Sequence, residues 1–251
     1  MKAAPPIVLN PEGRVAGLIV ADHAGRSVPE GLDLGLAPGW HDTHHFWDPG
    51  VAEVARMIAA RLDVPVVMGD VSRLVLDTNR WLEDPRSILT QVEGEPIAGN
   101  AALAAADRLA RQEAVFWPFH EAVGRLWARQ TDRHPRPFFL ALHSCTRVFG
   151  GFRRPWDAGT IRHDDRQLSD ALLAGLGRDS TLTLGDNQPY TGLDGVYTVD
   201  RHSYGSGLPA CGLELANDLL ETAAGCSAWA DRLTHVLAGL QGAALPAEAR
   251  A

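Results

Sequence analysis

Cysteine is scarce in this sequence, and no CxxC pair occurs. The three cysteines, Cys145, Cys211 and Cys226, are too few for a disulfide framework, so we expect a reducing compartment. There is also no run of about 18 apolar residues, which excludes a membrane-spanning helix. The N-terminal residues contain no apolar segment of the kind found in secretory signals. These absences predict a cytoplasmic protein that has no membrane partner.

Concentrated positive charge is missing as well. The formal net charge is -8, and we find no basic cluster beyond short arginine pairs such as Arg153-Arg154. A nucleic-acid-binding protein usually carries a basic patch, so we expect no nucleic-acid partner. The overall acidity does not exclude an anionic small-molecule substrate, because a few arginines in a cleft can reverse the local field.

The length and composition fit one large α/β domain. The chain has 251 residues, of which 45% are hydrophobic and 22% are charged, and this is enough for a sizeable core. No internal repeat divides the chain, and neither does any linker rich in glycine, serine or proline. We therefore expect a single domain over residues 1–251, with its core between about residues 15 and 241.

Hydrophobic patterning predicts strands that alternate with helices. Short apolar runs predict strands at 17–21, 64–69, 72–80, 137–142, 181–185 and 210–215. Amphipathic periodicity predicts helices at 51–62, 165–176 and 227–240, and a longer one at about 100–130 that Pro118 should kink or break. Asp48 followed by Pro49 suits the N-cap and first turn of the 51–62 helix. The alternation predicts an α/β fold with a central, mostly parallel sheet and helices on both faces.

Polar residues recur at the ends of three apolar runs. His23, His143 and the Asn79-Arg80 pair each stand at such a position. Ligands of open α/β sheets bind at the carboxyl ends of the strands. Three such positions therefore predict a shared cleft.

The two histidines are the best candidates for metal ligands. Neutral imidazole suits zinc, and two histidines with one carboxylate leave one coordination position open. The segment HDTHHFWDPG (41–50) offers the carboxylates of Asp42 and Asp48, with His41, His44 and His45 as nitrogen alternatives. The pattern leaves the third ligand open, because a helix cap also accounts for Asp48.

Other polar residues suggest catalytic and binding roles. Glu214 lies in the apolar run 210–215, where a carboxylate is costly to bury unless it is paired or acts as a general base. Arg73, Asn79 and Arg80 suit the recognition of a carboxylate or the polarisation of a scissile carbonyl. A surface salt bridge is the competing interpretation for each arginine.

Four further positions allow more than one interpretation. His120 falls in a helical pattern typical of a core histidine, whereas His202 follows an expected strand (YTVD) and can face the cleft. Ser144 and Cys145 could act as nucleophiles, but neither stands in a GxSxG motif, and His143 beside them is better explained as a metal ligand. Besides a metal-dependent enzyme and an enzyme with a serine or cysteine nucleophile, the sequence allows a third class of function: a binding protein that keeps the fold but has no catalytic activity.

The order of short motifs resembles the N-formylglutamate amidohydrolase family from about Val20 to Leu220. In chain order the matching blocks are DHAG (22–25), HHFWDPG (44–50), SRLVLDTNR (72–80), PIAGN (96–100), FWPFH (116–120), LHSCT (142–146), RPW (154–156), DNQPY (186–190) and GLPACGLELANDL (207–219). No block is specific alone, but their number and order identify the chain as a member.

This family is similar in turn to zinc carboxypeptidases, so the resemblance implies a phosphorylase/hydrolase-like α/β fold and one Zn2+ per chain. It implies that the ligands are His23, Asp48 and His143, and that Glu214 is the general base. The implied reaction is hydrolysis of an N-formyl or other N-acyl amino acid, with N-formyl-L-glutamate giving formate and L-glutamate. A carboxypeptidase-like hydrolase of small peptides is the alternative.

The resemblance also implies a substrate-binding role for the Asn79-Arg80 pair. Asn79 and Arg80 would hold the substrate carboxylate, while Arg73 is expected to support the carbonyl oxygen. Further substrate-binding candidates are Ser144, Asn187, Tyr190 and His202.

Two positions depart from the family pattern. The His-Ser block of the family often continues with an aromatic residue and Thr-Pro, where this chain has Cys145-Thr146-Arg147. An arginine commonly stands two residues after the glutamate, where this chain has Ala216. Loss of that arginine bears on a carboxylate contact, and so on the identity of the substrate, more than on hydrolysis itself.

Overall fold

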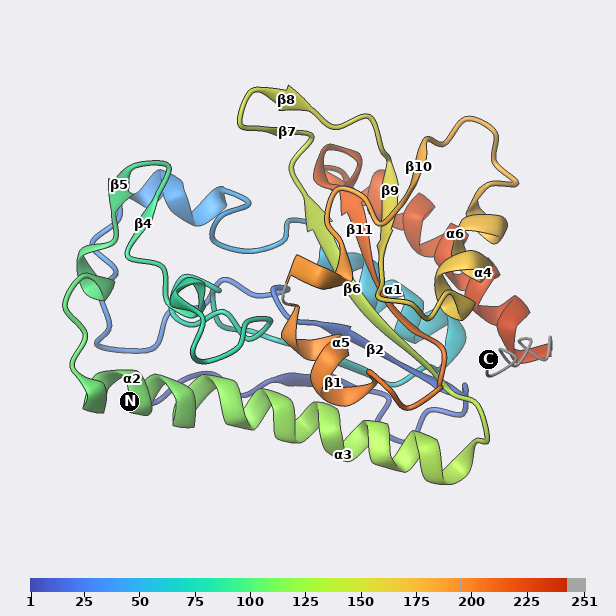
Figure 1. Cartoon of the computed structure of the whole chain (residues 1–251), viewed down its shortest axis with the longest axis horizontal. Coiled ribbons are helices and arrows are strands. Elements are labelled where there is room, and N and C mark those ends of the chain that lie inside the picture. Colours follow the sequence, from blue (N-terminus) through green and yellow to red (C-terminus); the bar gives the residue numbers. More distant parts are fainter. Residues whose placement is uncertain (195, 243–251) are drawn as a thin grey trace.

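The centre of the computed structural model, which describes residues 1–194 and 196–242, is a seven-stranded sheet (Figure 1). From edge to edge its strands are β1 (Ile7–Leu9), β3 (Val66–Met68), β2 (Gly17–Ala21), β6 (Phe138–Cys145), β11 (Ala210–Ala216), β9 (Ala158–Ile161) and β10 (Leu184–Asp186). Strands β3, β2, β6 and β11 run parallel to one another, and β10 runs parallel to β9. Strand β1 is antiparallel to β3, and β9 is antiparallel to β11. The predicted mixed, mostly parallel sheet is confirmed.

The central strands are buried on both faces, which explains their continuous apolar runs. Side chains alternate along a strand, so Leu18 and Val20 of β2 pack into one core while Ile19 and Ala21 pack into the other. All four have no exposed surface. Burial on both faces fixes the register, because a slip by one residue would exchange the two sets.

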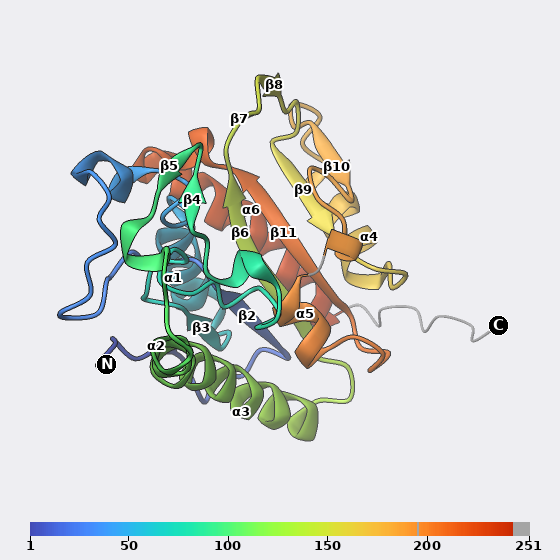
Figure 2. The same ribbon diagram turned by 60° about the vertical axis from the view of Figure 1, so that its left-hand side comes forward.

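Helices cover both faces of the sheet (Figures 1 and 2). Helices α1 (Val51–Leu62), α4 (Gln167–Leu176) and α6 (Ala223–Gly242) share the larger apolar core, and α3 (Trp117–Arg133) and α5 (Tyr197–His202) lie on the opposite face. Short 3-10 helices lie at Pro38–Asp42, Pro85–Ser87, Ala98–Asn100, Gly192–Asp194 and Asn217–Leu220. The α/β fold is thereby confirmed. Within the described part of the chain, no helix combines the length and apolar character needed to cross a bilayer.

Pro118 does not break the long helix. Helix α2 (Ala105–Arg111) continues through a π-helical turn (Gln112–Phe116) into α3, so that the three form one rod. Proline has no N–H to donate to the preceding turn. The wider π-helical turn ends two residues before Pro118 and accommodates this missing donor. Of the predicted kink or break, the break is wrong, although the π-helical turn interrupts the regular α-helical pattern just before Pro118.

Two segments predicted as strands have other structures. Residues 72–80 form successive turns, in which Arg73 and Asp77 form a salt bridge of 2.9 Å. The YTVD run before His202 is the start of α5, where the Asn79 side chain accepts a hydrogen bond from Thr198 N at 3.0 Å. In both segments polar tertiary contacts outweigh strand propensity, which depends strongly on context.

The predicted cap of α1 is also wrong. Gly50, and not Asp48, occupies the N-cap position, and no side chain caps the helix. Gly50 has a φ of 80°, and a Cβ there would lie 2.3 Å from Leu220 Cβ. Both conditions require glycine. The carboxylate of Asp48 therefore remains available for other contacts.

Two β-hairpins extend beyond the carboxyl ends of the parallel strands, as Figure 2 shows. One pairs β4 (Gln91–Val92) with β5 (Glu95–Pro96), and the other pairs β7 (Val148–Phe149) with β8 (Phe152–Arg153). The sequence pattern predicted neither hairpin, nor β1 and β9. These strands are two to four residues long, too short to show a hydrophobic period.

The tight approach of β9 to the 186–190 loop gives a test of the fold. A Cβ on Gly159 would lie 1.7 Å from Gln188 O, whereas a Cβ on Gly239 of α6 would meet nothing within 4 Å. We expect Gly159→Ala to lower the free energy of unfolding by about 1–3 kcal/mol, because backbone must move. The control Gly239→Ala should raise it by about 0.5–1 kcal/mol, because alanine favours the helix. Urea unfolding measures both changes, and a shift of the same sign in both would contradict this packing.

Candidate metal centre and active site

The strand ends bring the predicted site residues to one edge of the sheet. His23 lies in the turn two residues after β2, His143 lies in β6, and Glu214 lies in the neighbouring β11, paired in register with His143. Asp48 comes from the connection before α1, and its backbone N–H donates to His23 O at 2.8 Å. The loop that carries the carboxylate is thus tied to the loop that carries the first histidine.

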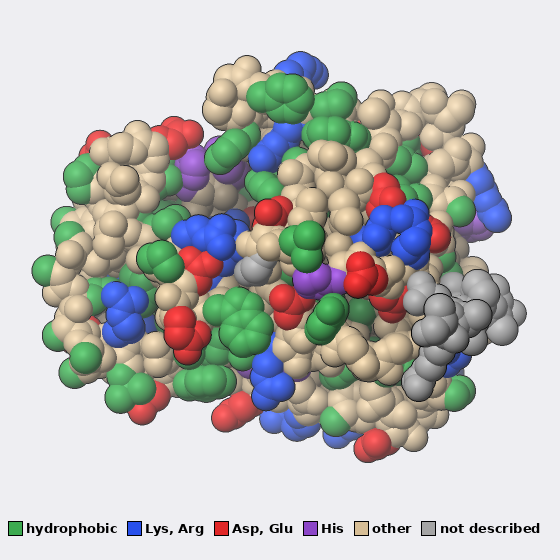
Figure 3. Space-filling view, in the orientation of Figure 1, with side chains coloured by type: hydrophobic (Ala, Val, Ile, Leu, Met, Phe, Trp, Pro, Cys, Tyr) green, Lys and Arg blue, Asp and Glu red, His purple; other side chains and the backbone are tan. Residues whose placement is uncertain are grey.

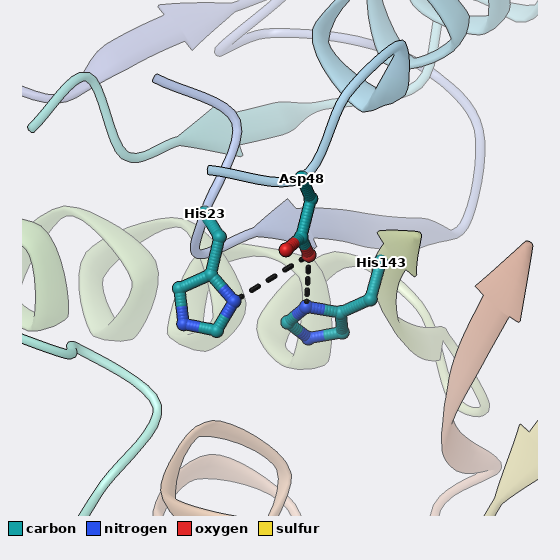
Figure 4. Close-up of side chains that lie close together, drawn as sticks. All are labelled: His23, Asp48 and His143. Atoms are coloured by element: carbon teal, nitrogen blue, oxygen red, sulfur yellow. Dashed lines mark hydrogen bonds and ion pairs between the residues drawn. The ribbon is translucent and has the colours of Figure 1, made fainter. Parts of the chain in front are cut away.

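His23, Asp48 and His143 face one another in a buried cluster (Figure 4). Asp48 Oδ2 lies 3.0 Å from His143 Nδ1 and 3.4 Å from His23 Nδ1. His23 Nδ1 is buried and has no hydrogen-bond partner. One donor atom from each residue lies within 4.8 Å of the other two, so the group can hold a metal ion.

The outward sides of both imidazoles face carboxylates. His23 Nε2 lies 2.7 Å from Asp77 Oδ1, and His143 Nε2 lies 3.6 Å from Asp22 Oδ2. A carboxylate behind a metal-binding histidine fixes the ring and its tautomer, leaving the other nitrogen free to bind the metal. Asp77 in particular is in position to leave Nδ1 of His23 as the metal-facing atom.

Arg73 connects the two buried aspartates. Its guanidinium lies 3.5 Å from Asp48 Oδ1 and 2.9 Å from Asp77 Oδ2. Burial alone would raise the pKa of each aspartate, but the facing histidines, together with Arg73 in the case of Asp77, hold both pKa values below the usual range. Both aspartates are therefore ionised at neutral pH.

The pKa values of the two histidines are shifted in the opposite direction, upwards. Burial and nearby Arg73 lower the pKa of His23, but the carboxylates of Asp77 and Asp48 outweigh them and raise it to about 9. Burial also lowers the pKa of His143, but Asp48 reverses this and raises it. The carboxylates thus favour positive charge between the rings, where a cation would bind.

Glu214 has the environment of a general base. Its side chain is buried, and its Oε2 has no hydrogen-bond partner. Burial raises the pKa of Glu214, although positively charged His143 in the adjacent strand opposes this. A carboxylate with a raised pKa accepts and returns a proton more readily near neutral pH.

A cavity of about 590 Å³ opens onto these residues. Of the predicted site residues, those that line it are His23, Asp48, Arg73, Asn79, Arg80, His143, Ser144, Tyr190 and Glu214. The Asn79 amide nitrogen lies 3.4 Å from His143 Nε2, and the Arg80 guanidinium donates to Asp194 O at 3.3 Å. The structure therefore brings together nine of the residues selected from the sequence.

Two predicted substrate contacts lie outside the lining of this cavity. Asn187 Oδ1 accepts a hydrogen bond from Arg162 N at 2.7 Å, on the far side of β9. His202 lies against His120, with 3.1 Å between their ring nitrogens, and His120 in turn lies 2.9 Å from Thr78 O. Both histidines support the segment that carries Asn79.

Two of the alternative ligands in the 41–50 segment, Asp42 and His45, have other partners. Asp42 pairs with Arg26 at the surface, at 2.6 Å. His45 lines the cavity, but its Nε2 lies 3.1 Å from Glu93 Oε1. Asp48 is thus the carboxylate of this segment that both histidines face.

A serine or cysteine nucleophile has little support in this geometry. The Ser144 hydroxyl donates to Pro49 O at 2.9 Å, and no base contacts it. Burial raises the pKa of the Cys145 thiol and so disfavours the reactive thiolate. Ser144 instead holds the Asp48 loop, since its backbone N–H also points to Asp48 Oδ2, at 3.4 Å.

Sequence reasoning missed several supporting residues. Asp77 and Asp22 were not selected, although both follow apolar residues in matching blocks. Arg154 was also missed; it is buried, donates to the Tyr190 hydroxyl at 2.8 Å and stacks on the Tyr190 ring, with 4.9 Å from its guanidinium carbon to the ring centroid. Its position in the RPW block was the available signal.

Comparison with known proteins agrees with the motifs. The sequence profile of N-formylglutamate amidohydrolase matches residues 15–221. The chain belongs to the N-formylglutamate amidohydrolase family. Membership confirms the resemblance found in the sequence and places the chain among enzymes that hydrolyse amide bonds.

Two solved structures have the same fold as this family member. A gene product of Agrobacterium tumefaciens is 32% identical, with a TM-score of 0.88 and 94% of each chain covered. N-formylglutamate amidohydrolase from Ralstonia eutropha JMP134 is 19% identical, with a TM-score of 0.73, and the match covers 96% of this chain and 98% of that chain. A comparison with curated protein sequences finds no match.

The geometry of the metal-binding group predicts which substitutions remove the metal. His23→Ala and His143→Ala should each lower the bound metal to background, because two remaining ligands hold the ion too weakly. Asp42→Asn and His45→Gln should keep full occupancy, since neither side chain faces the group. Elemental analysis of the purified variants measures this. Full occupancy in His23→Ala or His143→Ala would contradict the assignment.

Proposed function

We propose that this protein is a zinc-dependent amidohydrolase that cleaves the amide bond of an N-formyl or other N-acyl amino acid. The observation that carries the proposal is the convergence of His23, Asp48 and His143 at the bottom of a cavity that Glu214 also lines. N-formyl-L-glutamate, named by the family, is the reference substrate for testing it.

The donor set supports zinc. Donor atoms about 2.0–2.1 Å from a tetrahedral ion lie roughly 3.3–3.4 Å apart. The separations of 3.0 and 3.4 Å between Asp48 Oδ2 and the two histidine nitrogens are close to this value. Two nitrogens and one oxygen are also a common zinc set, in which a fourth position stays open for water or substrate.

Bound zinc would supply Lewis-acid chemistry, lowering the pKa of a water molecule to roughly 7 and polarising the acyl oxygen of the substrate. Glu214 then removes the proton from the attacking water. The C–N bond breaks, and Glu214 delivers the same proton to the departing amine, so that the products are a carboxylic acid and a free amino acid. Its burial and raised pKa suit both halves of this transfer.

The arginines and Asn79 would bind the substrate. Arg73 is placed to stabilise negative charge on the acyl oxygen, and its contacts with Asp48 and Asp77 hold it beside the metal-binding group. Asn79 and Arg80 would bind the substrate carboxylate, with Tyr190 closing the opposite side. Because Asn187 and His202 lie outside the cavity lining, we do not assign them substrate contacts.

Substitution of Glu214 separates proton transfer from metal binding. Glu214→Gln keeps the shape of the side chain but removes the base, so kcat should fall by about 10²–10⁴-fold. Metal content and substrate KM should change little, because Glu214 is not among the grouped metal ligands. Steady-state kinetics with elemental analysis tests this, and near-full turnover with zinc bound would eliminate the general-base role.

Substitution of Arg80 tests the carboxylate site. Arg80→Ala should raise KM for N-acyl amino acids at least tenfold with a smaller change in kcat, because it removes a contact made with the bound substrate. Arg86→Ala is a matched control, since Arg86 donates to the same carbonyl, Asp194 O, from outside the cavity. Equal effects of the two substitutions would show that Arg80 acts only through the loop.

A further inference from the structure

One part of the cavity wall, away from the metal-binding residues, is apolar. The residues that provide this surface are Leu89, Val92, Phe149, Ile161, Val196 and Val199. Two of them, Val92 and Phe149, come from the β4–β5 and β7–β8 hairpins. The space-filling view shows hydrophobic side chains beside histidines in the depression between the hairpins (Figure 3).

The cavity is also larger than a formylated glutamate needs. Its volume of about 590 Å³ falls within the range of roughly 300–1,000 Å³ that is typical of sites for drug-sized ligands. N-formyl-L-glutamate is a smaller molecule than that. Apolar surface that stays in contact with water stabilises nothing. The volume of the cavity and its apolar wall therefore favour a substrate that covers this surface.

Carboxylates outnumber arginines among the described residues that line the cavity. Asp48, Glu93, Asp194 and Glu214 line it, against Arg73 and Arg80. Both arginines already face Asp77, at 2.9 and 4.0 Å respectively. A divalent metal ion would bring the lining only to about neutrality. A substrate that carries one carboxylate therefore suits this cavity better than one that carries two.

Among the described residues, no lysine or arginine other than Arg73 and Arg80 lines the cavity. Burial and neighbouring His45 lower the pKa of His44 to about 4, so its imidazole is neutral at neutral pH. His45 faces Glu93 at 3.1 Å. Arg154 keeps its charge but is not part of the lining, and its guanidinium packs against the rings of Tyr190 and Phe149.

We infer that the preferred substrates are N-acyl amino acids with a bulky, uncharged side chain and not N-formyl-L-glutamate. The inference rests on the proposed function. The one carboxylate common to all such substrates takes the Asn79-Arg80 site. The second carboxylate of glutamate would lie against the apolar side chains of the wall and near the like charge of Glu93, which is on the same hairpin as Val92. An uncharged side chain avoids this penalty and gains contact with Val92 and Phe149.

Matched substrates test the charge directly. We expect kcat/KM of the zinc-loaded enzyme for N-formyl-L-glutamine to exceed that for N-formyl-L-glutamate at least tenfold, because the two differ in charge but hardly in shape. N-formyl-L-leucine and N-formyl-L-methionine should be hydrolysed at least as well as the glutamine compound.

Two variants test which residues make the enzyme distinguish between these substrates. Glu93→Gln should reduce the ratio of glutamine to glutamate activity several-fold, whereas Glu95→Gln, on the same hairpin but outside the lining, should leave it unchanged. Phe149→Ser should raise KM for the leucine compound several-fold more than KM for the glutamine compound.

The results distinguish a failure of this inference from a failure of the proposed function. Equal or better hydrolysis of N-formyl-L-glutamate would overturn the inference while the amidohydrolase activity stands. No hydrolysis of any of the four compounds by the zinc-loaded enzyme would overturn both. Binding of the same compounds to zinc-loaded Glu214→Gln, measured by calorimetry, should show the same order of affinity, and tighter binding of the glutamate compound would again overturn the inference.

Discussion

The buried carboxylate of Asp48 is the interaction on which the rest of the site depends. It is 2% exposed and faces His23, His143 and Arg73. Its backbone N–H bonds to His23 O, so the same residue also ties the end of β2 to the start of α1. Removing one partner from a buried ion pair commonly costs about 3–5 kcal/mol, because the remaining charge is left uncompensated. The strand ends, the helix start and the 72–80 turns are therefore held together by charge as well as by packing.

The same charges prepare the site for chemistry. Asp77 and Asp48 raise the pKa of His23 against the effect of burial, which shows a local field that favours a cation. Glu214, one strand further along, keeps an unpaired carboxylate oxygen in a buried position. Unsatisfied polar atoms are costly in a folded protein and concentrate at functional sites. Here the Glu214 oxygen is held by β11, which is a central strand with little freedom to relax.

Different parts of the fold carry the chemistry and the walls around it. The charged bottom of the cavity is built from the ends of parallel strands, whose register is fixed by burial on both faces. The outer walls come in part from the short hairpins, of which β7–β8 exposes Phe149 and Phe152. Changes in the hairpins can alter which side chain the cavity accepts without disturbing the residues at its bottom.

The sequence alone determined the fold class, the long buried strands and nine of the residues that line the cavity, because each depends on a local pattern. Apolar runs that end in His23, His143 or Glu214 place those side chains at one sheet edge in any parallel arrangement. The order of the motifs identified the family, and the family pattern favoured Asp48 as the third metal ligand. Local sequence patterns alone did not distinguish Asp48 from Asp42 or His45 as the third ligand. They also did not distinguish a metal ligand from a helix cap at Asp48.

Tertiary structure decided the remaining features of the site, because these features depend on contacts between residues distant in the chain. Asp48 caps no helix because Gly50 does so and because two histidines, from β2 and β6, face its carboxylate. The 72–80 segment turns because Arg73 must reach both Asp77 and Asp48. His202 and Asn187 match the pattern of site residues, yet their side chains bond to His120 and to the backbone N–H of Arg162. Periodicity cannot reveal such contacts, because it reports only which face of an element is apolar.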